Sequence, residues 1–153
     1  MNVITRIPER NAFTLHSQHQ RMGRTADEYR AGALGSILTR SRKAGVSFTY
    51  DHRRRDAWDA QADGFSEMPS LRSDILSAGG WWKPSDRWSF DLSLTRLGEQ
   101  RYGGDMKAAR PEMAAQAEQR DHRIWMGTLS GRWQSADSNT RIQAYMGWQQ
   151  LAR

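Results

Sequence analysis

Four carboxylates lie close together in one polar segment of this 153-residue chain: Asp56, Asp59, Asp63 and Glu67. A hard cation such as Ca²⁺ is held by several carboxylate and carbonyl oxygens, and one flexible segment can supply them. The spacing therefore makes this segment a candidate calcium site. The alternative, which we take as the default, is an acidic loop that is solvated and binds no ion.

No catalytic set accompanies these carboxylates. The sequence has zero cysteines, which excludes a disulfide scaffold, a thiolate zinc site and a cysteine nucleophile. It also lacks a Gly-x-Ser-x-Gly elbow, a phosphate-binding glycine loop and a His-Glu-x-x-His pair. The histidines lack zinc-motif spacing, and His16 and His19 would fall on opposite faces of a strand. We expect a protein that is not an enzyme, with no cofactor beyond the candidate calcium.

The basic run Arg53-Arg54-Arg55 ends a predicted strand. Guanidinium groups bind phosphates through paired hydrogen bonds, so in an outer membrane these residues would suit lipid headgroups or lipopolysaccharide. The alternative is a solvated loop edge. The formal charge is +6, from 23 Lys and Arg against 17 Asp and Glu. Because the acidic residues are interspersed with the basic ones, this charge is weak evidence for a nucleic-acid partner.

The elements that must position these residues are strands. Apolar and polar residues alternate with period two, most clearly over Arg87–Leu97, where Trp88, Phe90, Leu92 and Leu94 share one face. No run of about 18 uncharged apolar residues could form a spanning helix, although short alternating strands could still form a transmembrane barrel. The predicted strands are Ala12–Gln20, Tyr29–Arg40, Ala44–Arg53, Leu71–Lys83, Arg87–Leu97, His122–Gln134 and Thr140–Leu151.

The predicted connections alternate in length, which is typical of an outer-membrane barrel meander. Short links are expected at Ser41–Lys43, Pro84–Asp86 and Ser135–Asn139, and long links at Arg21–Glu28, Arg54–Ser70 and Gly98–Asp121. Within the last of these, Ala108–Arg120 could form at most a short helix. Tryptophans near predicted strand ends suit an interfacial girdle, or alternatively the core of a soluble β-domain. They are Trp81, Trp82, Trp88, Trp133 and Trp148.

Several strings resemble TonB-dependent outer-membrane receptors. Asn2-Val3-Ile4-Thr5-Arg6 followed by Pro8 resembles the end of the plug domain, just before the first barrel strand. Later strings are similar to loops and turns of one receptor subgroup, in the same order. They are Asp63-Gly64-Phe65 with Pro69 and Leu71, Lys83-Pro84-Ser85-Asp86-Arg87, Arg101-Tyr102-Gly103-Gly104-Asp105, Pro111-Glu112, Ala117-Glu118-Gln119 and Asp121-His122-Arg123-Ile124.

This resemblance implies a domain division and an incomplete fold. Residues 1–10 would be the C-terminal tail of a plug, and residues 11–153 the N-terminal strands of a barrel of about 22 strands. The fold class expected is all-β, an antiparallel meander of about seven strands that forms one section of a large transmembrane β-barrel. Because such barrels have an even number of strands, the chain would not span a membrane alone. Its start also lacks a signal peptide.

The function implied is transport into the cell of a scarce solute, such as a ferric siderophore or cobalamin. The partners implied are outer-membrane lipid and lipopolysaccharide, the small-molecule substrate, and the TonB complex, which the missing part of the plug would contact. Related receptors often carry a denser acidic run where this chain has Gln61 and Ala62. The residues expected nearest the solute lie in the outward loops: Trp58, Phe65, Arg101 and Tyr102.

Two other interpretations stay open. A soluble basic β-protein could bind single-stranded nucleic acid, with aromatic rings stacking on bases and arginines contacting phosphates. Such rings should share the polar, arginine-bearing face, whereas Trp88 and Phe90 share a face with leucines. We therefore expect no nucleic-acid partner. A small barrel closed by several copies of the chain is the third interpretation, and an odd strand number makes it awkward.

Overall fold

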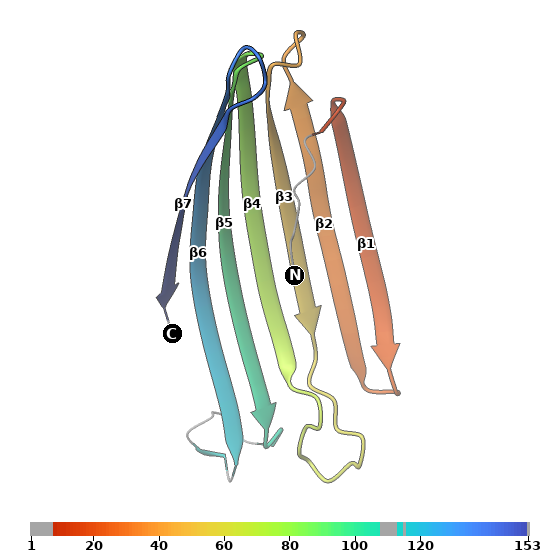
Figure 1. Cartoon of the computed structure of the whole chain (residues 1–153). Helices are drawn as coiled ribbons and strands as arrows, with labels where there is room; N and C mark the ends of the chain where they lie inside the picture. The colour runs from red at the N-terminus through yellow and green to blue at the C-terminus, as the bar shows by residue number, and fades with distance from the viewer. Residues whose placement is uncertain (1–7, 108–112, 115, 153) are drawn as a thin grey trace.

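The chain forms a single antiparallel sheet in the computed structural model, which describes residues 8–107, 113–114 and 116–152 (Figure 1). Its seven strands follow one another across the sheet in chain order. They are β1 (Ala12–Met22), β2 (Ala26–Leu38), β3 (Ala44–Arg55), β4 (Ser70–Ser85), β5 (Trp88–Gly104), β6 (Ala117–Gln134) and β7 (Arg141–Ala152). The predicted all-β class and the seven-strand meander are confirmed. Within the described ranges, no helix has the length and apolar composition needed to cross a membrane.

The connections between successive strands lie alternately at the two ends of the sheet. The short-turn end carries residues 39–43, 86–87 and 135–140, at the top of Figure 1. The long-loop end carries residues 23–25, residues 56–69 and the start of the connection after β5, residues 105–107. The long link predicted over Arg21–Glu28 is wrong, because β1 and β2 are joined by a tight turn in which Gly23 has φ +57°.

The strands at the long-loop end extend further than the alternation indicated. Gln100–Gly104 and Ala117–Asp121 pair with each other in β5 and β6, where the alternation predicts a loop. The reason is that backbone groups form the ladder between strands, so polar residues such as Gln100 and Asp121 can pair as strand residues. Polar composition therefore marked the end of the apolar pattern but not the end of the strands. Of the predicted short helix, residues 108–112 and 115 lie outside the described residues, while Ala117–Arg120 belong to β6.

Arg10 and Asn11, which precede β1, form hydrogen bonds with β2. Ser36 Oγ donates a hydrogen bond to the Arg10 carbonyl at 2.9 Å, and the Leu38 amide donates to Asn11 Oδ1 at 2.7 Å. Most of the plug tail predicted over residues 1–10, including the Asn2–Arg6 string, lies outside the described residues.

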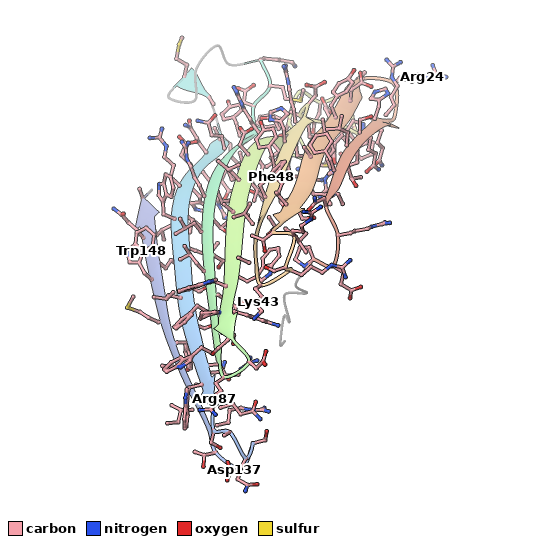
Figure 2. All side chains as sticks on the ribbon, turned by 90° about the horizontal axis from the view of Figure 1, so that it is seen from above. Arg24, Lys43, Phe48, Arg87, Asp137 and Trp148 are labelled. Atoms are coloured by element: carbon pink, nitrogen blue, oxygen red, sulfur yellow. The ribbon has the colours of Figure 1, made fainter. Side chains whose placement is uncertain are left out.

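The sheet has one apolar and one polar face, as the alternation predicted. Side chains that pair across neighbouring strands share a face, so the register defines the apolar face: Val46 lies opposite Gly80, which lies opposite Leu92, which lies opposite Leu129. Figure 2 shows side chains on both sides of a single layer of strands, with Arg24 at one end and Asp137 at the other.

Little of the apolar surface is covered. Among the described hydrophobic residues, those that are buried are Ala26, Leu71 and Trp81, and many large apolar side chains are exposed. A single layer has no second layer to bury its apolar face, whereas stable domains ordinarily pack two. The outer edges of β1 and β7 likewise carry no partner strand in the sheet.

Candidate functional site

The long-loop end brings three of the four candidate calcium ligands together. Carboxylate oxygens of Asp59, Asp63 and Glu67 all lie within 4.8 Å of one another in the loop between β3 and β4. Asp56 does not join them, because its Oδ2 accepts a hydrogen bond from the backbone amide of Asp27, at 3.4 Å. The candidate metal group is therefore a triad, and Asp56 instead ties the loop to β2.

Backbone amides of the same loop shape this triad. Asp59 Oδ2 accepts a hydrogen bond from the Gly64 amide at 2.7 Å, while its Oδ1 has no hydrogen-bond partner among the described residues. The Gly64 amide holds the pKa of Asp59 below its ordinary value of 3.8. Glu67 Oε2 accepts from the Ala60 amide at 2.6 Å. The triad therefore presents anionic oxygens, the ligand type that Ca²⁺ prefers.

The two long loops are joined to each other. The Ser66 amide donates to the Gly104 carbonyl at 2.9 Å, and the Gly104 amide donates to Ser66 Oγ at 2.8 Å. The Met106 amide donates to the Gly64 carbonyl at 2.8 Å. The turn at Gly64 requires its positive φ of +94°, which a residue with a side chain rarely adopts. These bonds hold the acidic triad beside the start of the second loop.

The four predicted solute-contacting residues do not form one site. Phe65 and Tyr102 both lie by Asp105, through a β-bridge and through a hydrogen bond from Tyr102 Oη to the Asp105 carbonyl at 3.1 Å. Arg101 lies on the polar face, where its Nε donates to Glu99 Oε1 at 2.7 Å. Trp58 packs over the β1–β2 turn, and its Nε1 lies 3.0 Å from where a Cβ on Gly23 would be. Only Phe65 and Tyr102 are thus brought together.

The apolar face carries a band bounded by aromatic residues, which we call the apolar band. Toward the short-turn end its boundary contains Trp82, Trp88 and Trp133, with Trp88 and Trp133 directly paired. Toward the long-loop end, Tyr50 and Trp125 fall on one row of the register. Two tryptophans depart from the predicted girdle: Trp81 lies on the polar face, and Trp148 lies in mid-strand opposite Gly127.

The apolar band is hollowed near the short-turn end. A hollow of about 510 Å³ lies over β2–β6, and Gly80 contributes no side chain to fill it. The side chains around it are almost entirely apolar and include Ile37, Val46, Trp82, Phe90, Leu92 and Leu129. The surface of this hollow therefore suits hydrocarbon chains.

The polar face is held by hydrogen bonds and ion pairs between strands. Ser77 Oγ and Thr95 Oγ1 lie 3.0 Å apart, and Arg30 Nε donates to both oxygens of Asp51, at 3.0 and 3.1 Å. His16 Nε2 lies 3.2 Å from the same carboxylate. Because His19 instead stacks on Tyr29 on the apolar face, the two histidines lie on opposite faces as predicted.

The basic run at the end of β3 is divided between the faces. Arg53 binds Glu28 on the polar face, and Arg55 donates two hydrogen bonds to the Pro69 carbonyl at 3.1 and 3.2 Å. Arg54 is exposed on the apolar face and lies directly opposite Arg72 of β4. Two residues of the run, Arg53 and Arg55, are therefore engaged within the protein, and Arg54 is its exposed member.

The register also reveals a group that sequence reasoning missed. Arg54, Arg72, Arg96 and Arg123 lie on the apolar face, one each on β3, β4, β5 and β6. They are far apart in the chain, and only the strand pairing places them together. Comparison of the chain with family models, with curated proteins and with solved structures finds no match to any of them.

Proposed function

We propose that this chain forms opening strands of the barrel domain of a TonB-dependent outer-membrane receptor. In that setting it serves the uptake of a scarce solute such as a ferric siderophore or cobalamin, and it catalyses no reaction. The observation that carries the proposal is the division of one sheet into an aromatic-bounded apolar face and a hydrogen-bonded polar face.

The dimensions of the apolar band support a lipid-facing role. Trp125–Trp133 spans nine residues of β6, and a transmembrane strand needs about 9 to 11. Beyond Trp125 the strands continue into a charged region. A soluble sandwich would cover the apolar face with a second sheet, whereas a lipid bilayer covers it directly. Barrel strands alternate apolar side chains toward lipid with polar side chains toward the lumen.

The positions of the loops support the direction of insertion. Receptors of this kind have short periplasmic turns and longer extracellular loops, so the long-loop end would face outward. Phe65, Tyr102 and the acidic triad would then lie on the solute side. Completion of the sheet by further strands would pair the open edges of β1 and β7, which would otherwise cost several kcal/mol per unpaired backbone group in hydrocarbon.

Calcium binding by the acidic triad is proposed as a property of this outward loop. Convergence of Asp59, Asp63 and Glu67 within 4.8 Å is the observation that favours it. Each of the three carboxylates offers one oxygen, and waters or carbonyls would complete the 6 to 8 oxygen ligands that Ca²⁺ takes. The ion would stabilise the loop conformation in which Asp59, Asp63 and Glu67 lie together. It would take no direct part in transport.

Translation of the DNA that flanks this reading frame tests the family assignment. Plug sequence upstream and further alternating strands downstream would support a receptor. Intergenic sequence on both sides, with a promoter and ribosome site before Met1, would contradict the assignment.

Quenching of tryptophan fluorescence by brominated lipid tests the membrane orientation in vesicles. We expect Trp88→Phe to remove part of the quenched signal, because Trp88 lies on the apolar face. The matched change Trp81→Phe should leave the quenched signal unchanged, because Trp81 is on the polar face and 6% exposed. A soluble monomer with sharp thermal unfolding and no lipid quenching would contradict the proposal.

A further inference from the structure

Four arginines stand together on the apolar face, just beyond the apolar band toward the long-loop end. They are Arg54, Arg72, Arg96 and Arg123, which we call the arginine row, and all four are exposed. Arg96 shares a register row with Trp125, while Arg123 lies opposite Gly98 one step further on. Arg54 and Arg72 face each other on the next step. Four successive strands thus place these arginines within three adjacent rows of the register.

The arginine row is poorly neutralised by the protein. Among the described residues, Arg54, Arg96 and Arg123 have no carboxylate within ion-pair distance, and Arg72 approaches Asp74 only at 3.9 Å. The Asp74 carboxylate already accepts from Tyr50 Oη at 3.0 Å and lies 2.7 Å from His52 Nδ1.

Two further carboxylates lie near the row. Asp121 accepts a hydrogen bond from Gln119 Nε2 at 3.1 Å, and Glu99 pairs with Arg101 on the polar face. Like charges directly opposite on neighbouring strands are destabilising, so Arg54 and Arg72 would gain from an anion between or beside them.

A hollow of about 420 Å³ opens beside three of these arginines. Its lining includes Arg72, Arg96 and Arg123, with Gly98 between them, and also the three carboxylates Asp74, Glu99 and Asp121, whose hydrogen bonds are given above. A Cβ placed on Gly98 would have nothing within 4 Å, so the space above this residue is open. Three guanidinium groups around an open space can donate several hydrogen bonds to phosphate oxygens, for which their planar geometry is suited.

The same hollow adjoins the apolar band. Leu76 lines it, and the Arg96 guanidinium carbon lies 5.4 Å from the centroid of the Trp125 ring. A ligand seated here would therefore meet cationic donors at one end and exposed aromatic and aliphatic side chains at the other. That combination fits an amphiphile with an anionic headgroup better than a free anion, which would leave the band uncovered.

We propose that the arginine row binds the phosphate of an anionic membrane lipid, whose acyl chains lie along the apolar band. This inference rests on the proposed function, because it requires the apolar face to meet a bilayer. In this proposal the arginine row contacts the headgroup. Arg53 and Arg55, which are engaged elsewhere, do not.

Spin-labelled lipids provide the test with the whole chain reconstituted in phosphatidylcholine vesicles. Lipids in contact with protein are motionally restricted, and their spectra give the relative affinity of spin-labelled phosphatidic acid and phosphatidylcholine. We expect preference for phosphatidic acid, reduced about tenfold or more in the triple variant Arg72→Gln/Arg96→Gln/Arg123→Gln, since each arginine near an anionic surface contributes roughly fivefold.

A matched variant separates location from overall charge. Arg120→Gln/Arg132→Gln/Arg141→Gln removes the same charge from residues with polar-face positions and should keep the preference. Equal loss in both triple variants would overturn the proposal. So would full competition by millimolar inorganic phosphate, which would indicate a free-anion site, or by a single-stranded oligonucleotide, which would indicate a nucleic-acid surface.

The failure of this inference can be told apart from failure of the proposed function. Absence of restricted lipid of either kind would show that the apolar face does not meet the bilayer, and both proposals would fall. Restricted lipid without preference for phosphatidic acid would overturn only the arginine-row site.

Discussion

Arg53 and Glu28 form a two-bonded ion pair across β3 and β2. Arg53 Nε donates to Oε1 at 2.7 Å, and Nη2 donates to Oε2 at 3.0 Å. The Glu28 side chain is 16% exposed and that of Arg53 is 39% exposed. The pair lies where the polar face approaches the long loops, and Arg55 Nη1 lies 3.9 Å from the same carboxylate.

Neutralising this carboxylate should destabilise the sheet. We expect Glu28→Gln to lower the free energy of unfolding by about 1 kcal/mol, because two charge-assisted bonds weaken and two arginines lose their partner. Urea unfolding in detergent micelles, followed by tryptophan fluorescence, measures the change. Glu118→Gln is the matched control. It removes the contact between Glu118 and Arg120, whose side chains are 66% and 61% exposed respectively. A pair this exposed should contribute little or nothing measurable, so equal losses in the two variants would contradict the prediction.

Calcium binding should depend on the triad and not on Asp56. We expect a dissociation constant of about 10⁻⁴ to 10⁻³ M, the range of extracellular calcium modules, measured by calorimetry. Asp63→Asn and Glu67→Gln should each weaken binding markedly, because each removes a ligand charge. Asp56→Asn should leave binding unchanged, since that residue contacts the Asp27 amide instead. Heat of binding that survives loss of both Asp63 and Glu67 would show that the ion lies elsewhere.

The loop conformation in which the Gly64 amide donates to the Asp59 carboxylate should be lost in acid. The Gly64 amide lowers the pKa of Asp59 from its ordinary 3.8, so the ionised form stabilises the native loop. That contribution is present above the ordinary pKa and is lost as the pH falls through the lowered one. Hydrogen exchange of the Gly64 amide should therefore show protection at pH 5 that falls below about pH 4. Asp59→Asn should remove this pH dependence, and an unchanged profile would exclude the carboxylate as its cause.

Two glycines of the sheet should differ in how much stability is lost when each is replaced by alanine. A Cβ on Gly45 would lie 2.2 Å from the Trp81 ring and 2.8 Å from the Ile37 carbonyl, so Gly45→Ala should cost about 1 to 3 kcal/mol through overpacking. A Cβ on Gly80 would meet only the Gly45 carbonyl, at 3.7 Å. Gly80→Ala should therefore have little effect on unfolding by urea. Similar losses for both variants would indicate a general cost of removing glycine rather than contact with Trp81.

The sequence predicted the strands because period-two alternation is a local property. Val46, Phe48 and Tyr50 share a face whatever lies beside them. Where the side chains became polar, the pattern failed: Gln100 and Arg101 were assigned to a loop, although they pair with Asp121 and Arg120. Their stability as strands depends on the ladder, which alternation does not report.

The site was predictable only in part, for a related reason. Asp59, Asp63 and Glu67 lie within one loop, so their proximity followed from spacing. The arginine row combines residues from four strands, and a shift of one residue in register would move any of them to the other face. Similarly, neighbouring Arg101 and Tyr102 were treated as one group, although a strand turns adjacent side chains to opposite faces.

The directions of the two edge strands limit how the sheet can be closed into a barrel. Every neighbouring pair in the sheet is antiparallel, so β1 and β7, at opposite edges, point the same way. Rotating a second copy about a barrel axis would therefore set β7 of one copy parallel to β1 of the other. Antiparallel closure needs an odd number of intervening strands, whatever molecule provides them. A ring of identical copies would therefore contain parallel pairs where the copies meet. A barrel completed by an odd number of other strands could be antiparallel throughout.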